Sequence, residues 1–171
     1  MLNQDLIGAH VKLTAFTEAN LTQDYLSWLN DRQLMKFSNQ RFRTHSMESC
    51  RAYLATFVGS DHMLIAIYFK GEFVGTMTAY RSVVHSTCDI GLLVCSTVQG
   101  KGVGKDAWGT LMAHLLASGT RKVTGGALSC NYAMVHIMKC CGMHSDGVRA
   151  RHEMVEGVPH DVLYFAKFNS P

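Results

Sequence analysis

The sequence predicts a single α/β or α+β domain built on a mixed sheet. Apolar runs typical of strands alternate along the chain with segments whose apolar residues recur at helical spacing. The chain has 171 residues, of which 47% are hydrophobic and 17% charged. A chain of this length buries roughly 70% of its unfolded surface in one core. Because there is no internal repeat, low-complexity tract or linker, we expect one domain over residues 1–171.

The first half of the chain predicts a strand, two helices and a hairpin, in that order. Residues 10–16 alternate apolar and polar side chains, as a half-buried strand does. Residues 20–34 carry large apolar residues at helical spacing, with Asn20 placed to cap the helix. Residues 46–59 open on a capping serine and close on a glycine, which is typical of a second helix. Residues 62–80 contain two β-rich runs around a Lys-Gly-Glu turn, so we expect a hairpin.

The second half predicts strand, helix, strand, helix and a final hairpin. Residues 87–94, TCDIGLLV, form a short apolar run typical of a buried strand. A stripe of apolar residues over 107–116 indicates a helix. Residues 121–129 predict a strand that two glycines weaken, and 131–141 predict a helix that the next glycine ends. Residues 147–168 form the last hairpin, and the complete order is that of an α/β or α+β domain.

Charge and hydropathy exclude several classes of protein. The net charge of +3 is too small for the dense basic stripe of a DNA-binding domain, so we expect no nucleic-acid partner. No segment approaches the ~18 apolar residues of a membrane span, and Asp5 and His10 interrupt any apolar core of a signal peptide. We therefore expect a cytoplasmic protein without a membrane partner. The sequence leaves the oligomeric state open, a homodimer included.

The cysteines predict reduced thiols rather than disulfides or a metal site. They form no CxxC pair and lie mostly in apolar runs, which favours buried thiols in a reducing compartment. The six are Cys50, Cys88, Cys95, Cys130, Cys140 and Cys141. His136 and Cys140 have the spacing of two metal ligands on one helix, but no second pair completes a site. We therefore expect no metal.

A glycine loop, residues 99–104 with the sequence QGKGVG, stands before the helix predicted at 107–116. Gly102, Gly104 and Ala107 satisfy the dinucleotide fingerprint G-x-G-x-x-A. The acidic residue that would bind a ribose about 20 positions further on is missing, however. The Walker A pattern also fails, because the loop is one residue short and Asp106 occupies the place of the Mg-binding hydroxyl. We therefore expect neither a dinucleotide-binding site nor a Walker A site at this loop.

Two interpretations of this loop stay open on physical grounds. Glycines allow backbone N–H groups to turn towards an anion, and the following helix adds the positive end of its dipole. Lys101 and Lys105 lie at the rim, and no Asp or Glu occurs from Ala107 to Ser145. This charge pattern suits a phosphate-bearing ligand. The alternative is a strand-to-helix turn that binds nothing.

The loop and a second segment together resemble a known family. Gln99-Gly100-Lys101-Gly102-Val103-Gly104 resembles the pyrophosphate loop Q/R-x-x-G-x-G/A of the GNAT superfamily of acyl-CoA-dependent N-acetyltransferases. NYAMVHIMKCCGM is similar to a later helix of that family, which an Asn opens and a Gly closes, as Asn131 and Gly142 do. The order of elements agrees along the whole chain. The resemblance implies a mixed, mostly antiparallel sheet with a splayed strand pair, flanked by about four helices.

The resemblance also implies acetyl-CoA as the co-substrate. Its pyrophosphate would lie on the loop, and its pantetheine arm would pair with the edge of the preceding strand like an added strand. The cofactor-binding residues implied in this way are Leu92, Leu93, Val94, Gln99, Gly100, Lys101, Gly102, Val103, Gly104, Lys105, Asn131 and Met138. A backbone N–H near Leu93 or Val94 would face the thioester oxygen, where one donor is worth roughly 3 kcal/mol as negative charge develops.

The candidate catalytic residues are a base and a less certain acid. The resemblance implies direct attack by a neutral amine, whose proton Asp89 would accept, with His85 as the second choice. Many relatives carry a Tyr that protonates the leaving thiolate, but Met138 occupies that place here. Ser129 or a water could serve instead, or the thiolate of CoA could leave unprotonated, because a thiol pKa of about 8.5 makes it a fair leaving group.

The acceptor is the least constrained part of the resemblance. Trp28, Asn30 and Asp31 match the W-x-N-D helix of relatives that acetylate ribosomal-protein N-termini or nucleotide-linked amino sugars. The following stretch is more similar to the amino-sugar group, and its basic residues would suit a nucleotide diphosphate. They are Arg32, Lys36, Arg41, Arg43 and His45. The same stretch could be a solvated loop or could receive an acidic peptide. The expected activity is therefore acetyl transfer to a small-molecule amine, or to a peptide N-terminus, with a catalytically inactive CoA sensor as the other class.

Overall fold

The structure is a computed structural model that describes residue 2 and residues 4–169. Its strands are β1 Leu6–Ile7, β2 Val11–Ala15, β3 Met63–Phe69, β4 Glu72–Ser82, β5 Thr87–Val94, β6 Lys122–Leu128, β7 His144–Val155 and β8 Val158–Phe168. Its α-helices are α1 Gln23–Asn30, α2 Met47–Ala55, α3 Val103–Ala117 and α4 Tyr132–Cys140. Three short 3₁₀ helices are η1 Glu18–Asn20, η2 Asn39–Phe42 and η3 Ser96–Val98. The predicted order of elements is confirmed, with β1 as an addition.

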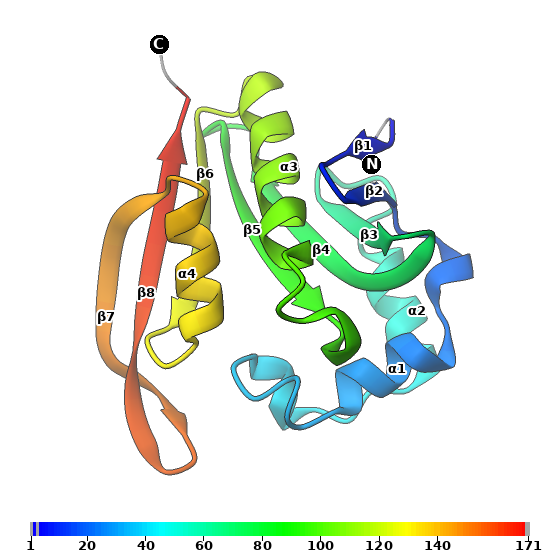
Figure 1. Cartoon of the computed structure of the whole chain (residues 1–171), viewed down its shortest axis with the longest axis horizontal. Helices are drawn as coiled ribbons and strands as arrows, with labels where there is room; N and C mark the ends of the chain where they lie inside the picture. The colour runs from blue at the N-terminus through cyan, green and yellow to red at the C-terminus, as the bar shows by residue number, and fades with distance from the viewer. Residues whose placement is uncertain (1, 3, 170–171) are drawn as a thin grey trace.

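All eight strands form one mixed sheet (Figure 1). The spatial order is β1-β2-β3-β4-β5-β6-β8-β7, and every neighbouring pair is antiparallel except β5 and β6. These two run parallel and pair only from Thr87 opposite Lys122 to Asp89 opposite Thr124. Beyond that point β5 stays paired with β4, and β6 stays paired with β8. The splayed strand pair that the family resemblance implied is therefore present.

Helices cover both faces of the sheet and enclose two hydrophobic clusters. In Figure 1, α3 and α4 lie in front of the sheet and α2 lies behind it. Alternate residues of β3 divide between the two faces: Ile65 and Ile67 pack with the α3 residues, whereas Leu64 and Ala66 pack with the α1 and α2 residues. Trp108 lies at the centre of the larger cluster, 1% exposed. The face that carries α3 and α4 therefore holds the main core.

Two helix boundaries differ from the predicted ones. Thr22, rather than Asn20, caps α1, because its hydroxyl accepts the N–H of Tyr25. Asn20 is buried and donates to the Tyr68 hydroxyl over 2.8 Å, so its side chain is used in tertiary contact instead. Ser46 caps α2 as predicted, although that helix ends at Ala55 rather than near Gly59.

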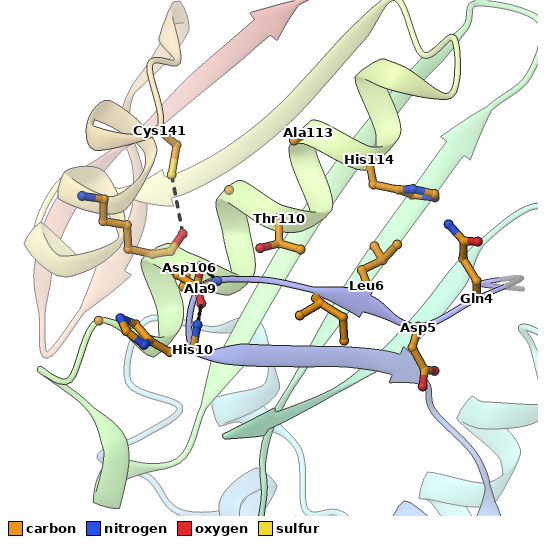
Figure 2. A pocket seen from close by; sticks show the side chains of 14 residues that line it. Gln4, Asp5, Leu6, Ala9, His10, Asp106, Thr110, Ala113, His114 and Cys141 are labelled. Carbon is orange, nitrogen blue, oxygen red and sulfur yellow. Dashed lines mark hydrogen bonds between the residues drawn. The ribbon is translucent and has the colours of Figure 1, made fainter. Parts of the chain in front are cut away.

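The first turn of α3 holds the N-terminal hairpin in place. The Asp106 carboxylate accepts the backbone N–H groups of Ala9, His10 and Val11 over 3.0, 2.7 and 3.0 Å (Figure 2). The turn approaches so closely that a Cβ on Gly8 would lie 2.6 Å from Thr110 Oγ1. Asp106 therefore has a structural function that explains why an acid stands next to the loop predicted to bind an anion.

We expect Asp106→Ala to lower the free energy of unfolding by about 2–3 kcal/mol, because three donors would lose a charged acceptor. Urea denaturation of the full chain measures this change. Asp5→Ala is the matched control, since it removes a carboxylate whose ion pair with Lys12 is half exposed and should be worth under about 1 kcal/mol. Equal effects of the two substitutions would contradict the structural function of Asp106.

Candidate functional site

An opening in the sheet begins where β6 leaves β5. Two glycines follow Thr124 on β6, and each lies against a ring. A Cβ on Gly125 would lie 2.7 Å from two carbons of the Trp108 indole, and one on Gly126 would lie 3.3 Å from the Tyr164 ring. Because neither position has room for a larger side chain, β6 can pack between these rings and away from β5. The edge of β5 beyond Asp89 is then free on that side.

The backbone N–H and C=O groups of successive β5 residues point alternately to β4 and to the opening. The N–H of Cys95 donates to Val74 O over 2.9 Å, and the carbonyl oxygen of Leu93 lies against Gly75, where a Cβ would collide with it. Since backbone groups alternate in direction along a strand, Leu92 and Val94 direct theirs towards the opening. Two backbone N–H groups were expected as donors to the thioester oxygen. That of Leu93 therefore points to β4, whereas that of Val94 points to the opening.

The glycine loop follows this edge after the short helix η3. Gly100 and Gly102 have φ values of 74° and 79°, and a Cβ at either position would meet open space. The Gln99 amide folds back and donates to Val94 O over 3.4 Å, which ties the loop to the end of β5. The loop is therefore held in shape and open on one side.

The N-terminus of α3 presents free backbone donors next to the loop. Gly102 is the N-cap, and the first intrahelical bond runs from Asp106 N to Gly102 O. The N–H groups of the three residues between them precede that bond, as at every helix start. The Val103 side chain is buried in the core, so only its backbone is available to a ligand. At Gly104 a Cβ would lie 3.1 Å from Ile137 and 3.2 Å from Leu92, which brings this helix end close to β5 and α4.

We expect Gly102→Glu to weaken acetyl-CoA binding at least about tenfold more than Gly102→Gln, since the two differ mainly in a negative charge beside the phosphates. Both substitutions strain a backbone with φ of 79°, so their comparison cancels the strain. Isothermal titration with acetyl-CoA measures the difference. Gly119→Glu is a remote control, because Gly119 also has positive φ and open surroundings but follows the far end of α3. Equal affinities of the Glu and Gln variants would remove the loop as a phosphate site.

Asp89 stands at the last paired position before the opening. Its neighbours along β5, Cys88 and Ile90, point into the core beneath α3, so Asp89 points to the opposite face. The Thr124 hydroxyl donates to Asp89 Oδ2 over 2.8 Å. The Asp89 residue is exposed to solvent overall, but the protein packed around its carboxylate raises its pKa by desolvation, and the hydrogen bond from Thr124 lowers it. A carboxyl group with a raised pKa in this place is suited to accept a proton.

The other predicted site residues occupy four different places around the opening. His85 is exposed in the turn before β5, beyond the closed end of the opening, and is not brought to Asp89. Ser129 is half-buried just after β6, on the opposite side of the opening from β5. Asn131 caps α4 by accepting the N–H of Met134 over 3.2 Å. Met138 is 0% exposed and lies against Gly125 under α4, so its side chain is part of the core.

The basic stretch between α1 and α2 is bound to the hairpin of β7 and β8. Lys36 pairs with Glu156 over 2.9 Å, and Arg41 pairs with Glu153 over 3.5 Å. Phe37 packs in a cluster with the end of β6 and the hairpin, so the stretch borders the opening. Two of the five basic residues proposed to hold a nucleotide diphosphate thus already have acidic partners. No local pattern in the sequence indicates these pairs, because the partners are more than a hundred positions apart.

A groove beside α3 is separate from the opening. It has a volume of about 870 Å³ and runs along α3 past β1, lined by Gln4, His10, Thr110 and His114 among others (Figure 2). It adjoins the loop through Gly102 and Lys105 but includes neither Asp89 nor the free edge of β5.

Within residue 2 and residues 4–169, no three His, Cys, Asp or Glu side chains are grouped as metal ligands would be. None of the helices described has the length and apolar character needed to cross a membrane. The six cysteines are free thiols, three of them buried.

A splayed strand pair with a glycine loop and a helix N-terminus at its mouth defines an acyltransferase of the CoA-binding type. The sequence model of the family described as acetyltransferase (GNAT) domain matches residues 10–144. The chain therefore belongs to the GNAT family, whose members are acetyl-CoA-dependent N-acetyltransferases. No curated protein sequence matches the chain.

Three solved structures show the same fold at low sequence identity. RimL, a ribosomal L7/L12 alpha-N-protein acetyltransferase in complex with coenzyme A, has a TM-score of 0.85 and 16% identity, covering 96% of this chain and 98% of its own. Spermidine N-acetyltransferase from Vibrio cholerae, with CoA and spermine, has a TM-score of 0.84 and 14% identity, covering 94% and 96%. The microcin C7 self-immunity acetyltransferase MccE, with acetyl-CoA and AMP, has a TM-score of 0.81 and 16% identity, covering 94% and 93%.

Proposed function

We propose that this acetyltransferase binds acetyl-CoA across the opening between β5 and β6 and transfers the acetyl group to a primary amine. One observation carries the proposal: the free edge of β5 at Leu92 and Val94 leads through η3 into the glycine loop 99–104, which Gln99 ties back to Val94. The amide groups of pantetheine would pair with that edge, and the pyrophosphate would accept the loop and helix N–H groups. Lys101 and Lys105 would supply charge at the rim.

The amine would attack the thioester from the face on which Asp89 lies. Its nitrogen bonds to the carbonyl carbon, the carbon–sulfur bond breaks, and the Asp89 carboxylate takes the proton from nitrogen. A backbone N–H at the open edge, with Val94 as the candidate, would stabilise the oxygen as it gains charge. The sulfur leaves as the CoA thiolate, or takes a proton from Ser129 or water. Met138 has no part in this step because it is buried.

The acceptor we would test first is a peptide N-terminus. The ion pairs of Lys36 and Arg41 with the β7–β8 hairpin reduce the positive charge available to a diphosphate. RimL, which shares the fold over nearly the whole chain, acts on a protein N-terminus. A nucleotide-linked amino sugar remains the second candidate, because the ion pairs of the described residues involve neither Arg32 nor Arg43.

The test is thiol release from acetyl-CoA with a panel of amines. The panel holds a ribosomal-protein N-terminal peptide, a UDP-linked amino sugar, spermidine and an aminoglycoside, and mass spectrometry identifies each acetylated product. Turnover with any member supports acetyl transfer, and the preferred member identifies the acceptor class. Binding of acetyl-CoA by calorimetry with no product from any member would favour a CoA-binding sensor instead.

A further inference from the structure

We propose that Thr124 is a positioning residue for Asp89, whose hydroxyl holds the carboxylate at the closed end of the opening in both of its protonation states. This inference rests on the proposed function of Asp89 as the base. Thr124 does not touch the substrates in this scheme and acts only through Asp89.

The register of the sheet brings the two side chains together. Asp89 and Thr124 are the last partners in the parallel pairing of β5 with β6, and glycines begin on β6 at the next residue. Parallel partners in register point to the same face, and here both point away from the core under α3. The carboxylate is therefore held at the point where the strands separate, next to the free edge of β5.

The hydroxyl has two acceptors within reach but one hydrogen to give. Thr124 Oγ1 lies 2.8 Å from Asp89 Oδ2 and 3.4 Å from the carbonyl oxygen of Cys88. While Asp89 is ionised, the hydroxyl donates to the carboxylate, which is the shorter and charge-assisted bond. When Asp89 takes the proton of the amine, its own O–H can donate to Oγ1, and the Thr124 hydrogen then turns to Cys88 O. The carboxyl group stays in place, and the proton remains on Asp89 until solvent removes it.

The Thr124 hydroxyl also opposes the rise in pKa that burial causes at the Asp89 carboxyl. Desolvation raises the pKa of this carboxyl, and the bond from Thr124 lowers it. Other titratable groups lie on the neighbouring strands: Tyr80 and Arg81 on β4, Cys88 on β5, and Lys122 on β6. Tyr80 bonds to the Tyr53 hydroxyl over 2.6 Å, and Lys122 pairs with Asp146 over 2.6 Å, so both are engaged elsewhere. Thr124 is thus the side chain bonded to the Asp89 carboxylate.

A direct titration of Asp89 tests the inference without knowledge of the acceptor. The full chain is labelled with ¹³C at aspartate carboxyl carbons, and the Asp89 signal is assigned by its loss in Asp89→Asn. We expect Thr124→Val to move the titration midpoint up by about 0.5 to 1 pH unit, because the bond to the ionised form is lost. Thr124→Ser, which keeps the hydroxyl, should restore the wild-type midpoint. An unchanged midpoint in Thr124→Val would overturn the inference.

The failure of this inference can be told apart from failure of the base assignment. The second measurement is thiol release from acetyl-CoA with the ribosomal-protein N-terminal peptide as the amine, for Thr124→Val and for Asp89→Asn. If Asp89→Asn loses turnover while Thr124→Val keeps both the wild-type midpoint and the wild-type kcat, only the positioning function is wrong. If Asp89→Asn keeps the wild-type kcat, Asp89 is not the base and Thr124 cannot act through it, whatever the midpoint does.

Discussion

Asp89→Asn should lower kcat by about 100- to 1000-fold while leaving acetyl-CoA affinity unchanged. The factor is that of a general base in position, and the affinity is unaffected because the loop and the free edge of β5 bind the cofactor through backbone groups. Steady-state thiol release gives kcat, and calorimetry gives the dissociation constant. Asp24→Asn is the matched control, since Asp24 is an exposed acid in the first turn of α1. Loss of cofactor affinity in parallel with kcat would contradict the assignment of Asp89 as base.

The same substitution has a defined effect on stability. Burial raises the pKa of Asp89, so the folded state disfavours the ionised carboxylate. This cost is absent well below the unfolded pKa of about 4, where the carboxyl is protonated in both states; it grows between that pKa and the raised folded pKa and is fully present above the folded pKa. Asp89→Asn removes the cost, so its melting temperature at pH 7 should equal or exceed that of the wild type. In the wild type, kcat/KM should fall as the pH drops through the same pKa, because only the ionised form of the free enzyme accepts a proton.

Trp108→Ala should lower the free energy of unfolding by about 3–5 kcal/mol, the range for removing a buried aromatic ring from a core. Trp108 is 1% exposed, its indole N–H donates to Met143 Sδ over 3.2 Å, and its ring covers Gly125. Urea denaturation measures the loss. Tyr132→Ala is the control, because Tyr132 is also aromatic but is 80% exposed at the start of α4 and should cost little.

A compensating change would show that Trp108 and Gly125 act as a pair. Gly125→Ala adds a methyl group 2.7 Å from the ring, and overpacking of this kind costs about 1–3 kcal/mol. With Trp108→Phe in the same chain, the smaller ring leaves space for that methyl group, so the two changes together should cost less than their sum. If the two losses in free energy of unfolding simply add, Trp108 and Gly125 do not act as a pair, and their contact does not cause β6 to separate from β5.

The sequence predicted the parts of the fold that depend on local patterns. The strand 87–94 was predicted with its observed bounds, because a short apolar run between turns has a clear signal. The glycine loop was also evident, since Gly100 and Gly102 occupy backbone conformations that favour glycine. Asp89 was chosen by resemblance, and the structure adds its position at the closed end of the opening.

The parts that could not be predicted depend on contacts between distant segments. Thr124 becomes relevant only when the register of β5 and β6 is known. Lys36 and Arg41 looked like free charges, because their glutamate partners lie in the last hairpin. Met138 was expected near the cofactor by its place on the helix, and only the folded chain shows that its side chain is buried against Gly125. In each case tertiary packing, rather than local propensity, decides what the residue does.

The short pairing between β5 and β6 has a consequence for how the molecule moves. Strands β1 to β5 and strands β6 to β8 form two blocks of the sheet that share only three pairs of residues, supported by α3 and α4. Such a seam is where local unfolding needs the least free energy. A ligand that contacts both blocks closes the seam and stabilises the fold by mass action. The feature that admits the cofactor is therefore also the part of the sheet with the shortest pairing between long strands, and a bound cofactor would bridge the two blocks there.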